Sequence, residues 1–259
     1  CEVVSNKDGS MNVDKLIEIA DDNWKNNNQP AIIVLSWGTT VCGVCDNVEE
    51  IKNRLNELEI PHYIHLDAAM YGGIGSNQKE SPAIHDLKKL NPDSISISFH
   101  KYIGSPTVNG ALICKKEIYD KKTNKQVEYI GQSDPTYLGS RDYPPLMIKY
   151  RISRLFNREN PDSYKKNIDF FIEKMNDNNI SFERRETGNT FVIDLPSTDI
   201  AQEYQLATFD DNKKAHIIIF PYHDKEIIEE LVSKLSKYND LNVSGEKKLT
   251  KSNSQVKKS

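Results

Sequence analysis

The segment Ser94-Ile95-Ser96-Ile97-Ser98 decides the fold of this 259-residue chain. Its polar and apolar residues alternate with a period of two, which predicts a β-strand. Phe99-His100-Lys101 follow at its carboxyl end, and a second predicted strand, His62–Leu66, ends at Asp67. In open α/β sheets, ligands bind at the carboxyl ends of the strands. The sequence therefore predicts a binding site that contains Asp67 and Lys101.

The sequence that precedes this second strand alternates between helical and strand-like patterns. A helix is predicted over Asp14–Trp24, and the apolar run Ala31–Trp37 predicts a strand buried on both faces. Another helix is predicted from Asp46, where Glu49 completes a capping box, and it ends before Pro61. Its predicted apolar face consists of Val48, Ile51, Leu55 and Leu58. Strand, helix and strand at this spacing form a βαβ unit, so we expect parallel strands.

The alternation continues along the chain, so the predicted fold class is α/β. A short strand is predicted over Ala111–Cys114, and the character of the sequence changes near residue 150. The elements predicted beyond are a helix opened by Pro144 and Pro145, helices over Ser163–Asn176, Asp199–Leu206 and Lys225–Tyr238, and strands over Ser181–Arg185, Thr190–Leu195 and His216–Phe220. We assign residues 1–150 to a large domain, 151–240 to a small α+β domain and 241–259 to a disordered basic tail.

The composition argues against two classes of partner. Hydrophobic residues make up 37% of the chain, charged residues make up 28%, and the formal net charge is -4. Without a strong basic field we expect no nucleic-acid partner, and without a run of about 18 apolar residues we expect no membrane span. The tail from Leu241 to Ser259 holds five lysines and one glutamate, a charge of +4. For this tail we favour a solvated end over a nucleic-acid arm.

The four cysteines are too few for a disulfide scaffold. Cys42 and Cys45 form a C-x-x-C pair, but a zinc site would need two more ligands nearby. We therefore expect structural thiols and no metal site. A thioredoxin-like redox pair remains the alternative, because the pair precedes a predicted helix. This cysteine usage is typical of a reducing compartment, and we expect a cytoplasmic protein.

An aspartate and a lysine at one edge of a sheet indicate pyridoxal 5'-phosphate (PLP) as the cofactor. PLP needs a lysine that holds its aldehyde as a Schiff base and a carboxylate that faces its pyridine nitrogen. The carboxylate stabilises the protonated ring, which is the better electron sink. The alternative for a lone lysine after a strand is a surface or salt-bridging residue.

Two motifs in combination favour the cofactor site. Ile64-His65-Leu66-Asp67-Ala68-Ala69 and the stretch from Ser94 to Pro106 resemble the group II PLP-dependent amino-acid decarboxylases. Within that group the chain is most similar to the histidine decarboxylase branch, which includes the plant serine decarboxylases. The resemblance covers about residues 1–238, and further segments that carry it are Gly38-Thr39-Thr40 with Gly43 and Asp46, Tyr129-Ile130-Gly131, Gly139-Ser140-Arg141, Tyr204–Ala207 and Ala215–Pro221.

This resemblance implies a fold and a reaction. The fold would be the PLP-dependent transferase fold (fold type I, aspartate aminotransferase-like), as a partial large domain plus a small α+β C-terminal domain. The reaction would be decarboxylation of an L-amino acid to the amine and carbon dioxide. Lys101 would form the Schiff base, Asp67 would pair with the pyridine nitrogen, and Ala69 would pack against one face of the ring.

Three further residues complete the site that the resemblance implies. Ser98 and His100 would lie by the cofactor phosphate, and Thr40 would lie beside the cofactor. His100 would also touch the substrate, so that Lys101 and His100 are the predicted catalytic residues. Three of the implied site residues have a plainer alternative, since Ser98 could end a strand, Ala69 could be core and Thr40 could cap a turn.

Departures from the family pattern bear on the choice of substrate. Phe99 stands where the family usually has glycine, Asp142-Tyr143-Pro144 replaces Asn-Gly-His, and Thr107–Gly110 replaces the usual Pro-Cys-Gly ending. We expect histidine as the substrate first, serine second and another amino acid third.

The family's upstream segment is not part of this sequence. In the family it supplies a phosphate-binding helix start, a histidine that stacks on the ring and a dimerisation arm. We therefore expect an N-terminally incomplete chain, a homodimer in the full-length protein, and weak cofactor binding by these 259 residues alone. The alternative functions are a truncated or degenerate relative without catalysis and another PLP-dependent carbon–carbon lyase.

Overall fold

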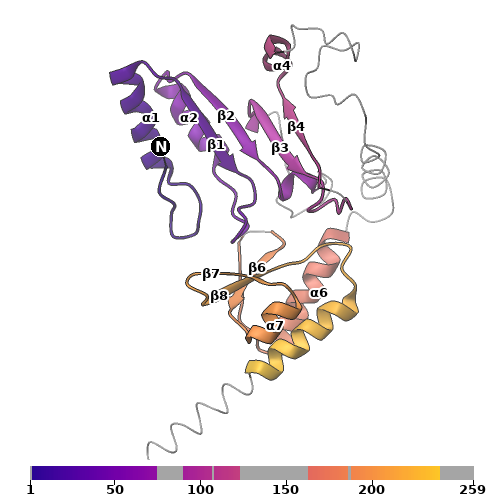
Figure 1. Cartoon of the computed structure of the whole chain (residues 1–259). Coiled ribbons are helices and arrows are strands. Elements are labelled where there is room, and N and C mark those ends of the chain that lie inside the picture. The colour runs from indigo at the N-terminus through magenta and orange to yellow at the C-terminus, as the bar shows by residue number, and fades with distance from the viewer. Residues whose placement is uncertain (1, 75–89, 107, 123–162, 186–187, 240–259) are drawn as a thin grey trace, which may run out of the picture. The chain divides into compact units, whose positions relative to one another are not determined.

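The computed structural model describes residues 2–74, 90–106, 108–122, 163–185 and 188–239 (Figure 1). The chain divides into two compact units, Cys1–Pro161 and Asp162–Ser259. The predicted domain boundary near residue 150, the helix predicted from Pro144 and the tail 241–259 lie outside the described residues. These three remain predictions.

The first unit holds a four-stranded sheet in the order β1-β2-β3-β4, drawn side by side in Figure 1. The strands are β1 (Ala31–Ser36), β2 (His62–Asp67), β3 (Ser94–Ser98) and β4 (Gly110–Cys114). β1 and β2 are parallel, as the predicted βαβ unit requires, and β2 and β3 are parallel too. β4 runs antiparallel to β3. A short 3-10 helix, η1 (Tyr71–Gly73), follows β2, and α4 (Lys116–Lys122), which sequence reasoning missed, follows β4.

One face of this sheet packs against α1 (Val13–Asn27) and α2 (Val48–Glu57). The core contains three residues of each helix and alternate residues of the strands: Leu16, Ile17, Ala20, Val48, Ile51, Leu55, Ile33, Leu35, Ile64, Leu66 and Ile95. Because side chains of a strand point alternately to opposite faces, the residues between these face away from both helices. Among the residues that the structure describes, α1 and α2 therefore cover one face of this sheet.

The strand predicted as buried on both faces is buried on one only, so that prediction is wrong. Ile32 and Val34 of β1 are 79% and 57% exposed, whereas Leu35 is fully buried. Within the described residues α1 and α2 cover only the face that carries Ile33 and Leu35. A run of apolar residues cannot distinguish a strand covered on two faces from one covered on a single face.

The predicted capping box of α2 is displaced by one residue. Asn47 caps the helix, since its Oδ1 accepts from the Glu50 amide (3.2 Å) and its Nδ2 donates to the Glu50 carboxylate (2.7 Å). Asp46 has a different role: its Oδ1 accepts from the Met11 amide (2.7 Å) and its Oδ2 accepts from the Ser36 amide (2.6 Å). At the other end of the helix, Leu58 is the C-cap residue and is exposed, so the apolar face ends at Leu55.

The second unit is an antiparallel sheet packed against helices, as the predicted α+β unit requires. Its strand order is β5-β6-β8-β7. The strands are β5 (Glu183–Arg184), β6 (Thr190–Asp194), β7 (Ala207–Phe209) and β8 (Lys214–Ile218), and the helices are α6 (Ser163–Asp177), α7 (Thr198–Glu203) and residues 225–239. β7 was missed by sequence reasoning. Phe171 of α6 packs edge-on against Phe191 of β6, with ring centroids 4.7 Å apart.

No helix among the described residues combines the length and the apolar character that a membrane span requires.

We expect the substitution Asp46→Ala to destabilise the first unit by about 2–4 kcal/mol, because two amides lose a charged acceptor. Trp24 and Trp37 are the two tryptophans of the chain, and both pack against the first unit's core. Urea unfolding followed by tryptophan fluorescence therefore reports on this unit.

The matched control is Asp14→Ala, which removes a 2.6 Å ion pair with Arg54 from a side chain that is 89% exposed. Such a pair contributes at most about 1 kcal/mol. Equal losses in the two variants would contradict the role of Asp46.

Candidate functional site

Asp67 ends β2, and its carboxylate lies at the carboxyl edge of the sheet. Its main-chain carbonyl accepts from the Trp37 amide (2.7 Å), which joins the ends of β1 and β2. Its side-chain Oδ1 accepts from the Ala69 amide (3.1 Å) and from the Ser96 hydroxyl (3.4 Å). Within the described residues both side-chain hydrogen bonds go to Oδ1. The other carboxylate oxygen is therefore able to accept from a bound group.

Backbone hydrogen bonds bring Ala69 and Ser98 to the same edge. The pairing of β2 with β3 continues past Asp67, since the Ala68 amide donates to the Ser96 carbonyl (3.0 Å). One step further, the Ser98 amide donates to the Ala69 carbonyl (3.3 Å). The structure thus places three of the predicted site residues along two hydrogen-bonded segments.

Lys101 lies in the turn that follows β3. Its amide donates to the Ser98 carbonyl (3.4 Å), and its own carbonyl accepts from the Gly104 amide (3.0 Å). The side chain is half-buried. Asp67 therefore ends one strand and Lys101 follows the neighbouring parallel strand, as the sequence predicted.

The imidazole of His100 is oriented by the loop before β4. Its Nδ1 lies 3.0 Å from the Asn109 carbonyl oxygen. A carbonyl oxygen only accepts, so Nδ1 carries the hydrogen of this bond. In the neutral ring the Nε2 lone pair is then the basic position, and the side chain is exposed. His100 can accept or donate a proton at Nε2.

Thr40 lies on the loop that connects β1 to α2, and it is exposed. Gly38 opens this loop with φ of +94°. A Cβ at Gly38 would come within 2.8 Å of the Tyr71 ring. The Gly38 and Thr39 amides both donate to the Val44 carbonyl, which folds the loop back on itself. The position of Thr40 is thus set by the path of this loop, on which it lies two residues beyond Gly38.

The Cys42/Cys45 pair lies on the same loop, and these thiols and that of Cys114 are half-buried. Cys45 pairs with Trp37 in an isolated β-bridge, and α2 begins three residues after it. Among the residues that the structure describes, no group of three or more His, Cys, Asp or Glu side chains is arranged to hold a metal ion.

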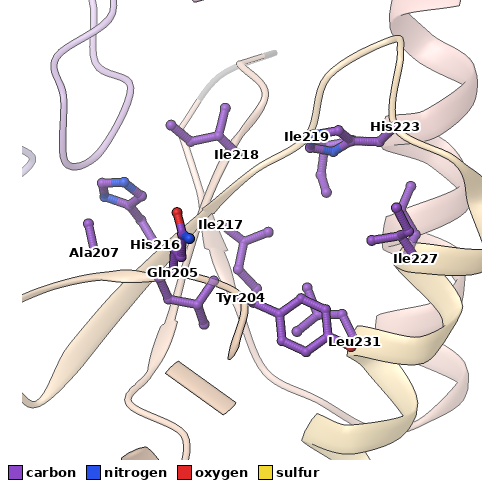
Figure 2. A pocket seen from close by; sticks show the side chains of 12 residues that line it. Tyr204, Gln205, Ala207, His216, Ile217, Ile218, Ile219, His223, Ile227 and Leu231 are labelled. Carbon is purple, nitrogen blue, oxygen red and sulfur yellow. The ribbon is translucent and has the colours of Figure 1, made fainter. Parts of the chain in front are cut away.

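A cavity of about 310 Å³ lies within the second unit. The sequence did not predict it. Figure 2 shows His216 and Gln205 on one side of it and His223 and Ile227 on the other. Burial lowers the pKa of both imidazoles below the ordinary value of histidine. None of the predicted site residues is among the residues that line this cavity.

The similarity of this chain to known proteins identifies its family. A family model described as the pyridoxal-dependent decarboxylase conserved domain matches residues 1–157. The chain belongs to the pyridoxal-dependent decarboxylase family. The match includes β1 to β4 and every predicted site residue of this decarboxylase-family chain.

Similar curated proteins are decarboxylases of two amino acids. The chain is 31% identical over 249 residues to histidine decarboxylase of Pseudomonas entomophila (strain L48), which covers 90% of the chain and 58% of that relative. It is 32% identical over 243 residues to histidine decarboxylase of Morganella morganii, covering 89% and 61%. Serine decarboxylase 1 of Oryza sativa subsp. japonica is 28% identical over 203 residues, covering 76% and 41%. The chain thus spans about three fifths or less of these relatives.

Solved structures share the fold of this chain at low sequence identity. L-methionine decarboxylase from Streptomyces sp. 590, in its internal aldimine form, has a TM-score of 0.69 at 16% identity and covers 90% of this chain and 60% of that one. Mouse CSAD has a TM-score of 0.70 at 13% identity, covering 91% and 57%. The predicted α/β class and fold type I are confirmed by these likenesses.

We expect Gly38→Ala to destabilise the first unit more than Gly9→Ala. Both glycines have positive φ, so each substitution strains the backbone by about 1–3 kcal/mol. At Gly9 the new methyl would meet only Val44, at 3.9 Å, whereas at Gly38 it would collide with the Tyr71 ring. The collision should add about 1–3 kcal/mol. Urea unfolding followed by tryptophan fluorescence measures both losses, and equal losses would show that the loop relaxes away from Tyr71.

Proposed function

We propose that this chain is the greater part of the catalytic region of a PLP-dependent decarboxylase, which converts an L-amino acid to its amine and carbon dioxide. The observation that carries the proposal is the carboxylate of Asp67 at the sheet edge, with both side-chain hydrogen bonds among the described residues on Oδ1. Lys101 follows the neighbouring parallel strand. Membership of the decarboxylase family supports this chemistry.

The residues at this edge fit PLP. A carboxylate oxygen accepts a hydrogen bond, which suits a protonated pyridine nitrogen, and a lysine amine suits an aldehyde. Ser98 and His100 provide a hydroxyl and an imidazole for the phosphate. When bound, PLP would supply the electron sink for the electrons released as carbon dioxide leaves. A small side chain at Ala69 would leave room for the flat ring.

The chain's own residues would divide the remaining work. Lys101 would hold the cofactor covalently through its aldehyde, and Asp67 would hold the proton on the ring nitrogen. His100 would accept or donate a proton at Nε2, since the Asn109 carbonyl fixes the hydrogen on Nδ1. Thr40 would lie beside the cofactor from the loop after β1.

For the substrate we propose histidine first and serine as the alternative, in line with the names of the relatives. Among the described residues, Phe99, Val108 and Asn109 depart from the family pattern and bear on this choice. The Phe99 amide donates to the Asn109 carbonyl (3.0 Å), the same oxygen that orients His100. The main chain of Phe99 and the imidazole of His100 are therefore held by one carbonyl oxygen, so the altered side chain is attached directly before the residue that would meet the substrate.

We further propose that the full-length protein is a cytoplasmic homodimer. The thiols of Cys42, Cys45 and Cys114 support a reducing compartment. The dimer is proposed from the resemblance to the family, and sedimentation velocity of the full-length protein tests it.

Borohydride reduction of the full-length protein with bound PLP should attach a pyridoxyl group to Lys101. Peptide mass mapping locates the modified residue. The variant Lys101→Arg should lose the label, because its guanidinium does not form the bond. The matched variant Lys115→Arg should keep it, since the Lys115 amine pairs with Asp93 at 2.7 Å. Label on another lysine, or no label, would overturn the assignment of Lys101.

Release of carbon dioxide should be fastest with histidine when the full-length protein is supplied with each amino acid in turn. Labelled carboxyl groups allow the gas to be counted directly. Faster release from serine would assign the protein to the serine decarboxylases. Release from neither histidine nor serine would mean that its substrate is a different amino acid.

A further inference from the structure

A row of polar side chains runs across the sheet face that α1 and α2 leave uncovered. The Tyr63 hydroxyl donates to Ser94 Oγ (2.7 Å), which lies 2.7 Å from His65 Nδ1. On the other side of the ring, His65 Nε2 lies 3.2 Å from Ser96 Oγ. The Ser96 hydroxyl donates to Asp67 Oδ1 (3.4 Å). The row therefore ends on the carboxylate of the candidate site.

The strand register explains why these side chains meet. His65 is paired with Ser94, and Asp67 with Ser96, across the parallel β2–β3 ladder. Residues two apart on a strand share a face, so Tyr63, His65 and Asp67 project to the same side. That side is opposite to the one that packs against the helices through Ile64 and Leu66.

The Asp67 carboxylate determines the direction of every hydrogen bond in the row. A carboxylate only accepts, so the Ser96 hydroxyl gives its hydrogen to Asp67 and its oxygen accepts from His65 Nε2–H. In the neutral imidazole Nδ1 is then unprotonated and accepts from the Ser94 hydroxyl. The Ser94 oxygen in turn accepts from Tyr63. Each serine hydroxyl thus donates one hydrogen bond and accepts another.

The row does not belong to the core cluster that the described residues form. That cluster lies on the opposite face, and Ile32 and Val34 on the face of the row are largely exposed in this chain. The imidazole of His65 is half-buried and is bonded at both nitrogens. It therefore orients the Ser96 hydroxyl rather than providing apolar contact. Because each link polarises the next, the row fixes the Ser96 hydroxyl towards Asp67.

We propose that His65 is a positioning residue, which holds the Asp67 carboxylate through Ser96 so that its second oxygen faces the bound cofactor. This inference rests on the proposed function. The Ser96–Asp67 contact is longer than an ordinary hydroxyl hydrogen bond, and the Ala69 amide also holds Oδ1. The effect of His65 on cofactor affinity is therefore smaller than that of an ordinary hydrogen bond to a charged group.

The test is the affinity of the full-length protein for PLP in the absence of substrate. We expect His65→Leu and Ser96→Ala each to weaken PLP binding by about fivefold to tenfold, which is less than the loss of an ordinary hydrogen bond to a charge because the Ser96–Asp67 contact is long. The double variant should be no weaker than either single one, because both break the same connection. His65→Gln should retain most of the affinity, since an amide can still donate to Ser96.

The matched control is His62→Leu on the same strand. His62 Nδ1 lies 2.8 Å from the Ile60 carbonyl oxygen and takes no part in the row. Its replacement should leave PLP affinity unchanged. Urea unfolding of each variant shows that it is folded before PLP is added.

A second readout needs no cofactor. The chain has six histidines, and ¹⁵N chemical shifts of their side chains at about pH 8 give the tautomer of each neutral ring. The signal that disappears in the spectrum of His65→Leu is the signal of His65. We expect the hydrogen of His65 on Nε2.

Three results would overturn the inference alone: unchanged PLP affinity in His65→Leu, losses that multiply in the double variant, or a hydrogen on Nδ1 of His65. A wild-type protein that binds no PLP would instead overturn the proposed function, and the positioning role of His65 with it.

Discussion

Main-chain pairing between β2 and β3 that continues past Asp67 is the constraint on which the candidate site depends. The Ala68 amide bonds the Ser96 carbonyl, and the Ser98 amide bonds the Ala69 carbonyl. A slip of one residue in this register would turn Asp67 to the face covered by α1 and α2. An unpaired carboxylate among those isoleucines would be strongly unfavourable. Folding of the core therefore selects the register that exposes the carboxylate at the sheet edge.

The register also gives the two faces of β3 different roles, since one face packs in the core and the other bonds polar side chains. Ile95 is buried in the core cluster, and its neighbours Ser94 and Ser96 project to the opposite face. Their hydroxyls bond the imidazole of His65. Since the period of a strand is two, one short segment contributes apolar contacts to the core and polar contacts to the site. Stability and chemistry are thus specified by alternate residues of the same strand.

The features that sequence reasoning predicted correctly are those set by local pattern. The alternation in Ser94–Ser98 predicted β3, and the end of β2 at Asp67 followed from the same kind of signal. The capping box was placed one residue early, because Asp46 bonds Met11, a residue 35 positions away. The row from Tyr63 to Asp67 escaped prediction as well. It requires the register between two strands that are separated by a long stretch of sequence.

Asp46 connects the stability of the first unit to the geometry of the site. Its amide donates to the Ser36 carbonyl (2.9 Å), while its carboxylate accepts from the Ser36 amide. These reciprocal bonds close the base of the loop that carries Thr40. Within the loop, Gly38 packs closely against the Tyr71 ring and holds the segment next to Thr40. Closing a loop at its base reduces the conformations open to the residues within it. The position of Thr40 therefore follows from two contacts outside the predicted site, which is why a motif match alone could name this residue but not explain its placement.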